Sequence, residues 1–237
     1  MRKIFLLTTV AMLAMNALAQ DAVTFGCISD TGVRTKVPGF SAGNNTSVEF
    51  RKEDDTNSFY ALMGFNYQLP AGKKVASAKL RFITERVKGG DASIYGYSND
   101  FEESTNWNVE QTYVESALES ALLFKGGLAG QRGKAIFDGL AEDKQNIEAW
   151  TNTIDVTSYV KKARTSRVNF LFANDESTGQ NCIYTREANT SMNRCPSFIT
   201  EDEMFKPTLE VVFVDDADTS VDRLLPVTDL ELREGDD

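Results

Sequence analysis

Hydrophobic and polar residues alternate with a period of two along residues 59–98, and turn residues interrupt this alternation twice. The interruptions contain Pro70 with Gly72, and Gly89 with Gly90. Alternation bounded by proline and glycine is typical of antiparallel strands with one buried face. The three strands predicted here are 59–67, 75–84 and 92–98.

Shorter runs of the same kind lie on both sides of this segment, and together they predict an all-β protein. About ten short strands separated by turn residues favour a single antiparallel β-sandwich. The predicted strands outside the central segment are 22–27, 47–51, 134–138, 153–156, 168–173, 181–187 and 208–214. The side chains expected between the two sheets are Leu80, Phe82, Phe170, Phe172, Val211 and Phe213.

One segment has helical rather than alternating spacing. Apolar residues recur at intervals of three and four between Val109 and Lys125, and two glycines follow. This spacing predicts one helical excursion that ends at the glycines and lies over one edge of a sheet. The alternative is a division of the same residues into a strand and a loop. A short helical turn is also expected at 158–163, with Thr157 as its cap.

The chain begins with the features of a secretory signal peptide. Two basic residues precede a short apolar stretch, and small residues up to Ala19 form a cleavage site. We therefore expect residues 1–19 to be removed and the protein to be secreted or held at the cell surface; an uncleaved membrane anchor is the alternative. Residues 20–214 form the predicted β-sandwich module. Residues 215–237 contain nine acidic residues, which indicates an acidic linker or disordered tail leading toward further domains.

Charge and composition narrow the function classes. The formal net charge of −10 becomes −12 when the signal segment and its two basic residues are removed. So acidic a protein is a poor partner for nucleic acid or an anionic membrane surface, and no membrane insertion is expected. The absence of histidine excludes the usual Ser-His-Asp and Cys-His catalytic arrangements and histidine-bound zinc. Structural calcium, which needs only oxygen ligands, stays open, and no other cofactor is expected.

The three cysteines allow more than one arrangement. Cys182 and Cys195 flank a polar loop, and in an exported protein this spacing predicts a disulfide. The alternative is two unpaired thiols in the loop. Cys27 is then left over and is expected to be a small buried hydrophobic residue, with pairing to one of the other two as the alternative.

A family resemblance is carried by several segments in order. They are the Leu69–Gly72 turn followed by Ser77–Phe82, the segment Ile154–Val160, the segment Tyr184–Ala188, and the segment Pro207–Val211. Together these resemble the DNRLRE-type β-sandwich module of secreted bacterial proteins, which is grouped with family 96 of carbohydrate-binding modules. The resemblance covers roughly residues 21–214 and implies a jelly-roll topology and glycan binding.

A candidate ligand site follows from the central strands. Lys79 and Arg81 lie on the mixed face of one predicted strand, and Tyr95 with Tyr97 lies on one face of the next. If these strands pair as a hairpin, basic and aromatic side chains meet on one surface, where sugar rings stack and carboxylates bind. The alternative is a solvated face with ordinary cross-strand pairs. Arg186 is a further candidate that fits the family's Arg-Glu-Ala strand, with an ion pair to Glu187 as its alternative role.

Two further groups of residues are candidates for ligand or ion binding. Trp107 and Trp150 are candidate platforms for a sugar ring, although burial is the commoner role of tryptophan. Residues 53–57 indicate a charged hairpin tip, with a calcium loop as the alternative.

The sequence thus predicts a secreted, non-catalytic carbohydrate-binding module. A cationic strip on an acidic protein favours an acidic polysaccharide as its partner over a neutral one. The alternative function is a structural or adhesive spacer in a surface protein. A hydrolase or lyase is the third class, but no pair of acidic residues is singled out by its spacing as the carboxylates of a glycosidase.

Overall fold

The computed structural model describes residues 22–130, 134–135, 146–163, 165–174, 179–193 and 195–216. In these residues every strand pairing is antiparallel, which confirms the predicted all-β antiparallel class. The strands are β1 (Ala22–Arg34), β2 (Ser47–Asp54), β3 (Asn57–Asn66), β4 (Lys73–Val87), β5 (Ala92–Tyr97), β6 (Leu122–Gly126), β7 (Lys134–Ala135), β8 (Thr151–Asp155), β9 (Arg167–Asn174), β10 (Gln180–Tyr184) and β11 (Thr208–Asp215). The helices are α1 (Trp107–Ser120) and α2 (Thr157–Lys162), with short 3-10 helices η2 (Ile147–Trp150) and η3 (Asp202–Met204).

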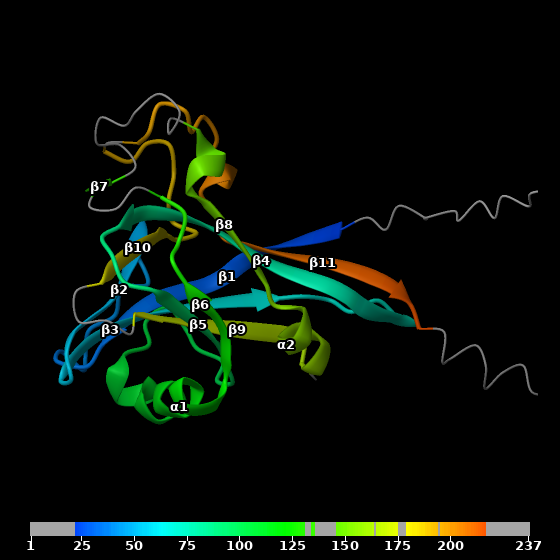
Figure 1. The fold of residues 1–237 in the computed structure, drawn as a ribbon. Helices are drawn as coiled ribbons and strands as arrows, with labels where there is room; N and C mark the ends of the chain where they lie inside the picture. The colour runs from blue at the N-terminus through cyan, green and yellow to red at the C-terminus, as the bar shows by residue number, and fades with distance from the viewer. Residues whose placement is uncertain are drawn as a thin grey trace, which may run out of the picture.

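Six of the strands close into a barrel in the order β1, β11, β4, β10, β2 and β3, because β3 also pairs with β1. The sheet continues outward from β3 through β9 and β5 to β6, and β7 and β8 pair with β4. The long strand β1 joins two parts of the sheet, since residues 22–26 pair with β11 and residues 27–34 pair with β3. Both ends of the described chain lie at the same end of the molecule (Figure 1).

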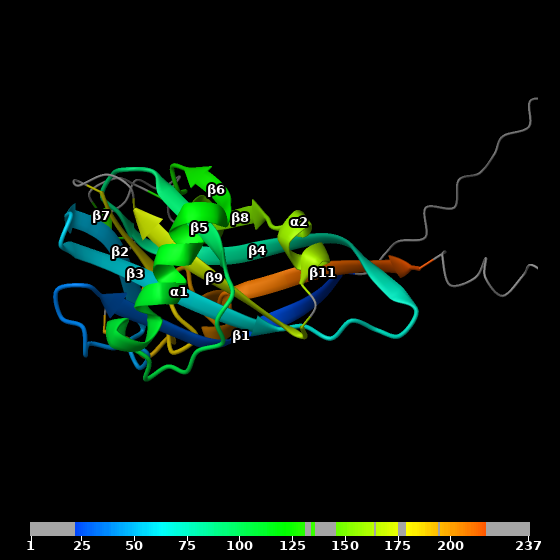
Figure 2. The same ribbon diagram turned by 90° about the horizontal axis from the view of Figure 1, so that it is seen from below.

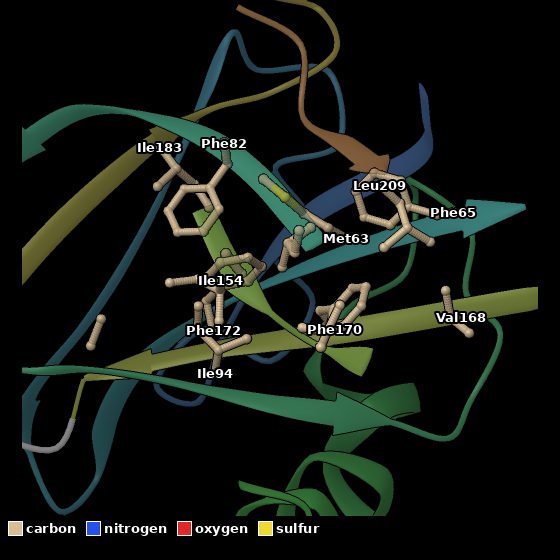
Figure 3. Packing of buried hydrophobic residues seen from close by; sticks show 14 of the residues in the cluster. Met63, Phe65, Phe82, Ile94, Ile154, Val168, Phe170, Phe172, Ile183 and Leu209 are labelled. Carbon is tan, nitrogen blue, oxygen red and sulfur yellow. The ribbon is translucent and has the colours of Figure 1, made fainter. Parts of the chain in front are cut away.

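The main hydrophobic core lies inside this arrangement. Phe82 on β4 contacts Phe172 on β9 edge to face at 5.2 Å between ring centroids, and Figure 3 shows both pointing into the cluster. Five of the six predicted core residues are buried: Leu80, Phe82, Phe170, Phe172 and Val211. The sixth, Phe213, is half-buried, because the pairing of β11 with β4 shifts register between Val212 and Phe213.

A second cluster fills the space between the sheet and α1. The helix begins after Asn106, whose side chain accepts a hydrogen bond from the Asn108 N–H, and it buries Val114 and Ala117. Figures 1 and 2 show α1 packed across β3, β5 and β9. The predicted helix is therefore present, but it covers a face of the sheet rather than an edge. It also ends at Ser120, and the following residues form β6 instead.

A third cluster lies on the other side of β4 and β10. Trp150 of η2 is fully buried there with Ile83 and Tyr184, and Phe205 closes the cluster from the segment after η3. Trp107, at the start of α1, is buried as well and stacks on Tyr60 at 5.7 Å. Both tryptophans therefore belong to the packed interior, so neither is an exposed platform for a sugar ring.

Two local predictions need correction. Thr157 does not cap α2: its hydroxyl donates to the Ala78 carbonyl of β4, while its N–H donates to the Asp155 carboxylate. Tyr184 ends β10, so Arg186 and Glu187 lie in the turn that follows, not in a strand. The predicted signal segment, the predicted tail beyond residue 216 and most of the predicted strand at 134–138 lie outside the described residues. Within the described residues, no helix has the length and apolar character needed to cross a membrane.

Candidate functional site

The cationic and aromatic strip predicted on β4 and β5 is not formed. β4 is flanked at this level by β11 and β8, whereas β5 pairs with β9 and β6. Lys79 is exposed, but its register partners on either side are Glu210 and Asp155, so acidic residues flank this lysine. Arg81 is half-buried and faces Thr208 and Thr153. β4 and β5 are consecutive in sequence but are not neighbours in the sheet, so the predicted site is wrong.

Tyr95 and Tyr97 are buried beneath α1 and are not available as a sugar platform. Tyr97 donates a hydrogen bond to the Glu110 carboxylate of α1, and Glu110 also accepts from Thr105 Oγ1 at 2.5 Å. Burial, followed by the contact with Glu110, raises the pKa of Tyr97 well above its ordinary value. These tyrosines hold the helix to the sheet, which is a packing role.

Tyr95 and Tyr97, although buried, each lie at the wall of a separate pocket, and Arg186 lines a third. Its guanidinium forms ion pairs with Glu103 and, at 2.9 Å, with Glu187. The pocket has a volume of about 690 Å³ and is called the Arg186 pocket below. Its lining residues come from β1 and from three separate connecting segments: Ile28, Ser29, Ser41, Gly43, Asn44, Asn45, Glu102, Glu103, Ser104 and Arg186.

Glu103 joins the walls of the Arg186 pocket. Its carbonyl accepts hydrogen bonds from Ser41 Oγ at 2.5 Å and from Thr31 Oγ1 at 3.0 Å, while its carboxylate pairs with Arg186. Gly43 lies so close that a Cβ there would be 2.2 Å from the Glu103 carbonyl oxygen. Only glycine fits this position without movement of the backbone, so the two walls are fixed against each other.

Behind Arg186 lies a buried carboxyl group, that of Asp30 on β1. Its Oδ2 accepts from the Arg186 backbone N–H at 3.0 Å and from the Cys27 thiol at 3.6 Å. Burial, and after it the nearby Glu187 carboxylate, raise the pKa of Asp30 to about 7, although the bond from the Arg186 N–H opposes this rise. Asp30 therefore anchors the turn that presents Arg186, and it does so from outside the pocket lining.

The chemistry of the Arg186 pocket is that of a polar hydrogen-bonding site. Hydroxyl, amide, carboxylate and guanidinium groups face it, and none of its described lining residues is aromatic. The charged lining residues are Glu102, Glu103 and Arg186, so acidic groups outnumber basic ones. Such a lining suits a neutral ligand that carries both donors and acceptors, and it disfavours a polyanion.

The predicted disulfide is also absent. Cys27, Cys182 and Cys195 are all free thiols in the structure. Cys182 is buried on β10, where its register partners are Glu49 of β2 and Arg86 of β4. Cys195 instead packs at the edge of the cluster around Trp150. The Cys182 thiol thus lies among paired strands, whereas the Cys195 thiol lies in a loop.

Metal binding has no candidate in the part of the chain described here, where no group of three or more Cys, Asp or Glu side chains is placed to hold an ion. Segment 53–57 contains the turn between β2 and β3 at residues 55–56, as predicted for a charged hairpin tip. Asp54 closes it by accepting hydrogen bonds from the Thr56 N–H at 2.7 Å and the Thr56 hydroxyl at 2.8 Å. These bonds lower the pKa of Asp54.

Sequence reasoning identified Arg186 but missed the residues that surround it. Segments 41–45 and 102–104 are polar connections between regular elements. Their polarity was the available signal, but nothing local indicates that they meet each other and the turn after β10.

Comparison with models of known protein families and with curated proteins gave no match. The resemblance to the DNRLRE-type module therefore stays a prediction.

Proposed function

We propose that this chain is a secreted, non-catalytic carbohydrate-binding module whose ligand occupies the Arg186 pocket. The observation that carries the proposal is the pocket itself: about 690 Å³ of open space lined by hydroxyl, amide, carboxylate and guanidinium groups. This volume lies within the range of small-molecule sites. Each sugar hydroxyl both donates and accepts hydrogen bonds, so it can pair with every polar group of this lining. The proposal includes a jelly-roll sandwich and export by the N-terminal segment.

The favoured ligand is a neutral glycan. The prediction of an acidic polysaccharide rested on a basic strip containing Lys79 and Arg81 beside the tyrosines of β5. The strands beside these two residues are β11 and β8 instead. Arg186 is already paired with Glu103 and Glu187, so its positive charge is compensated. A carboxylate on a sugar would meet Glu102 and Glu103 at the same pocket, and like charges repel.

A structural spacer is the alternative, and one observation favours it. The ion pairs of Arg186 connect the turn after β10 to the segment before α1, which is a stabilising function in itself. In that case the pocket is a space between surface segments. The two functions differ in what happens when an exposed pocket residue that makes no structural contact is removed.

Affinity electrophoresis separates the two functions. The parent protein is run through gels containing soluble neutral polysaccharides (a β-glucan, a mannan, a xylan) and acidic ones (an alginate, a pectate). The exposed residues Asn44 and Glu102 are changed in the variants Asn44→Ala and Glu102→Gln. Matched controls are Asn66→Ala and Glu119→Gln, which alter exposed residues outside the pocket.

Retardation by at least one neutral polysaccharide, weakened about fivefold by each pocket variant and unchanged in each control, supports glycan binding at this pocket; about fivefold corresponds to loss of one hydrogen bond. Equal mobility of the parent in every gel supports the spacer function. Retardation only by acidic polysaccharides would contradict the choice of a neutral glycan.

A further inference from the structure

A second hollow adjoins the Arg186 pocket. It has a volume of about 360 Å³ and is lined by residues of β1, β2, β3, β4, β10 and the segment between β1 and β2. Phe40 of that segment lines it with 40 % of its surface exposed, and it is called the Phe40 pocket below. Asn45 lines both pockets. The two hollows therefore share this residue, and segment 40–45 lines both of them.

Segment 40–45 is held in place by hydrogen bonds at several points. The Ala42 N–H donates to the Gly32 carbonyl of β1 at 3.2 Å, and the Thr185 hydroxyl donates to the Asn45 carbonyl at 2.5 Å. The Phe40 N–H closes a turn onto the Val37 carbonyl at 2.8 Å. Phe40 is thus an exposed aromatic residue on a segment whose backbone is held in place, which limits the ordering needed when a ligand binds.

A second aromatic ring lines the same hollow. Phe59 of β3 lies between the guanidinium groups of Arg34 and Arg51, each 4.3 Å from the ring centroid. The two arginines come from the strands that flank Phe59, since Arg34 of β1 and Arg51 of β2 are both its register partners. The two arginines therefore cover Phe59, and Phe40 supplies the exposed aromatic surface that the Arg186 pocket lacks.

The polar side of the Phe40 pocket is a row across three strands. Glu49 of β2, Cys182 of β10 and Arg86 of β4 are direct register partners, and all three line the pocket. The pairing of β10 with β4 shifts register at this point, so Glu85 lines the pocket beside Arg86. Carboxylates and a guanidinium thus face aromatic rings across one small hollow.

Arg86 gives a specific reason to expect a ligand. Its Nε is buried and has no hydrogen-bond partner among the described residues. A buried donor without a partner is unfavourable, because it has lost water and gained nothing in exchange. A ligand oxygen in the Phe40 pocket would reach this nitrogen only after the guanidinium turned toward the pocket, because the nitrogen is closed off from solvent.

We propose that the Phe40 pocket is a second sugar subsite, so that the ligand is an oligosaccharide that spans both pockets past Asn45. This proposal rests on the proposed function of the Arg186 pocket. The sugar unit in the Phe40 pocket is a pyranose whose apolar C–H face lies on Phe40. One of its ring or hydroxyl oxygens accepts from Arg86, and its hydroxyls donate to Glu49 or Glu85.

The test is a chain-length series measured by titration calorimetry. The probes are gluco-, manno- and xylo-oligosaccharides, each from the monosaccharide upward, with the parent protein and the variants Phe40→Ala and Asn44→Ala. Leu69→Ala is the matched control, because Leu69 is similarly exposed and lines neither pocket. In the parent, affinity should rise about tenfold or more between the monosaccharide and the chain that fills both pockets.

Both pocket variants should weaken the longer chain about fivefold or more, while at most one of them weakens the monosaccharide. Phe40→Ala that binds every chain like the parent, when Asn44→Ala is weakened, overturns the second subsite and leaves the proposed function standing. No binding of the parent to any probe overturns both. Binding that does not increase with chain length overturns the spanning oligosaccharide alone.

Cys182 offers a second readout that needs no substitution. Its thiol lines the Phe40 pocket and is 4 % exposed, whereas Cys27 and Cys195 line neither pocket. The rate of alkylation at each cysteine, followed by peptide mass spectrometry, should fall at Cys182 alone when a saturating oligosaccharide is present. An unchanged rate at Cys182 with bound oligosaccharide contradicts occupation of this pocket.

Discussion

The ring of Tyr159 lies directly against the backbone of Gly96. A Cβ at position 96 would be 2.5 Å from Tyr159 Cε2, closer than any real contact. The Tyr159 hydroxyl accepts from the Tyr97 N–H at 3.1 Å and lies 3.0 Å from the carbonyls of Tyr97 and Asn169, to one of which it donates. Tyr159 of α2 therefore joins β5 to β9 where their ladder ends, and the missing side chain of Gly96 makes room for it.

Gly96→Ala is expected to destabilise the protein by about 1–3 kcal/mol, because the added methyl displaces a well-packed ring. Urea unfolding of the variant measures the change in the free energy of unfolding. Tyr159→Phe, which keeps the ring and removes the hydroxyl, should cost only about 1 kcal/mol. In a Tyr159→Ala background the added cost of Gly96→Ala should nearly disappear; if it stays the same, the ring is not the cause.

Phe170→Ala is expected to cost about 3–5 kcal/mol, because Phe170 is fully buried and contacts Phe65 at 5.8 Å and Tyr159 at 5.5 Å between ring centroids. Phe213→Ala is the matched control, since it removes the same side chain from a half-buried position. Its cost in guanidinium unfolding should be clearly smaller. Equal costs would contradict the placement of Phe213 at the margin of the core.

Asp30 should make the protein less stable as the pH rises. Its pKa is raised from 3.8 to about 7 in the folded state, so between these values the folded protein binds more protons than the unfolded chain. The stabilising contribution of the protonated carboxyl is full below about pH 4 and is lost through about pH 7, with a total on the order of 4 kcal/mol. The groups facing Asp30 are Cys27, Glu187 and Arg186.

Asp30→Asn removes this titration and keeps an acceptor for the Arg186 N–H. The difference in unfolding free energy between variant and parent should therefore shift in favour of the variant between about pH 4 and pH 8. Exposed carboxylates with lowered pKa, such as Asp54 and Asp202, also make stability depend on pH. Their contribution is the same in both proteins and cancels in the difference. A pH-independent difference would show that Asp30 is ionised throughout.

The cysteines should behave as three free thiols. Alkylation of the unfolded, non-reduced protein is expected to modify all of them, and prior reduction should not change the mass of the product. In the folded protein Cys182 should react last, because it is buried whereas the other two are half-buried. A peptide linking Cys182 to Cys195 after digestion would restore the predicted disulfide.

Strand faces were predictable from sequence, but strand neighbours were not. The alternation in β4 correctly placed Leu80 and Phe82 inward, because side-chain direction follows from the local backbone, and Ile83 lies on the opposite face. The pairing of β4 with β5 was wrong. Gly89 and Gly90 both have positive φ in the connection between them, and β5 pairs with β9 instead of β4.

The candidate site was predictable only in part, for the same reason. Arg186 lies in the Arg-Glu-Ala segment that carries part of the family resemblance. Glu103 is remote from it in sequence, and only the fold brings the two residues together. Tyr95 and Tyr97 are two positions apart, so they share one face of β5, and the sequence pattern allowed that face to be the exposed face of the sheet. Their burial depends on α1, which the sequence predicted over an edge of a sheet and not over this face.

The pairing of β1 with β11 determines how the module responds to a pulling force. Ala22 pairs with Val212 and Gly26 with Thr208, so the two ends of the described chain lie side by side at the start of one antiparallel ladder (Figure 1). Tension applied through both ends acts across the strands, and it separates their hydrogen bonds one pair after another beginning at Ala22. Peeling of this kind needs little force compared with sliding whole strands past each other. A protein that had to transmit tension along a cell surface would be poorly served by this geometry, whereas one that holds a sugar beside a tethered partner would not be affected.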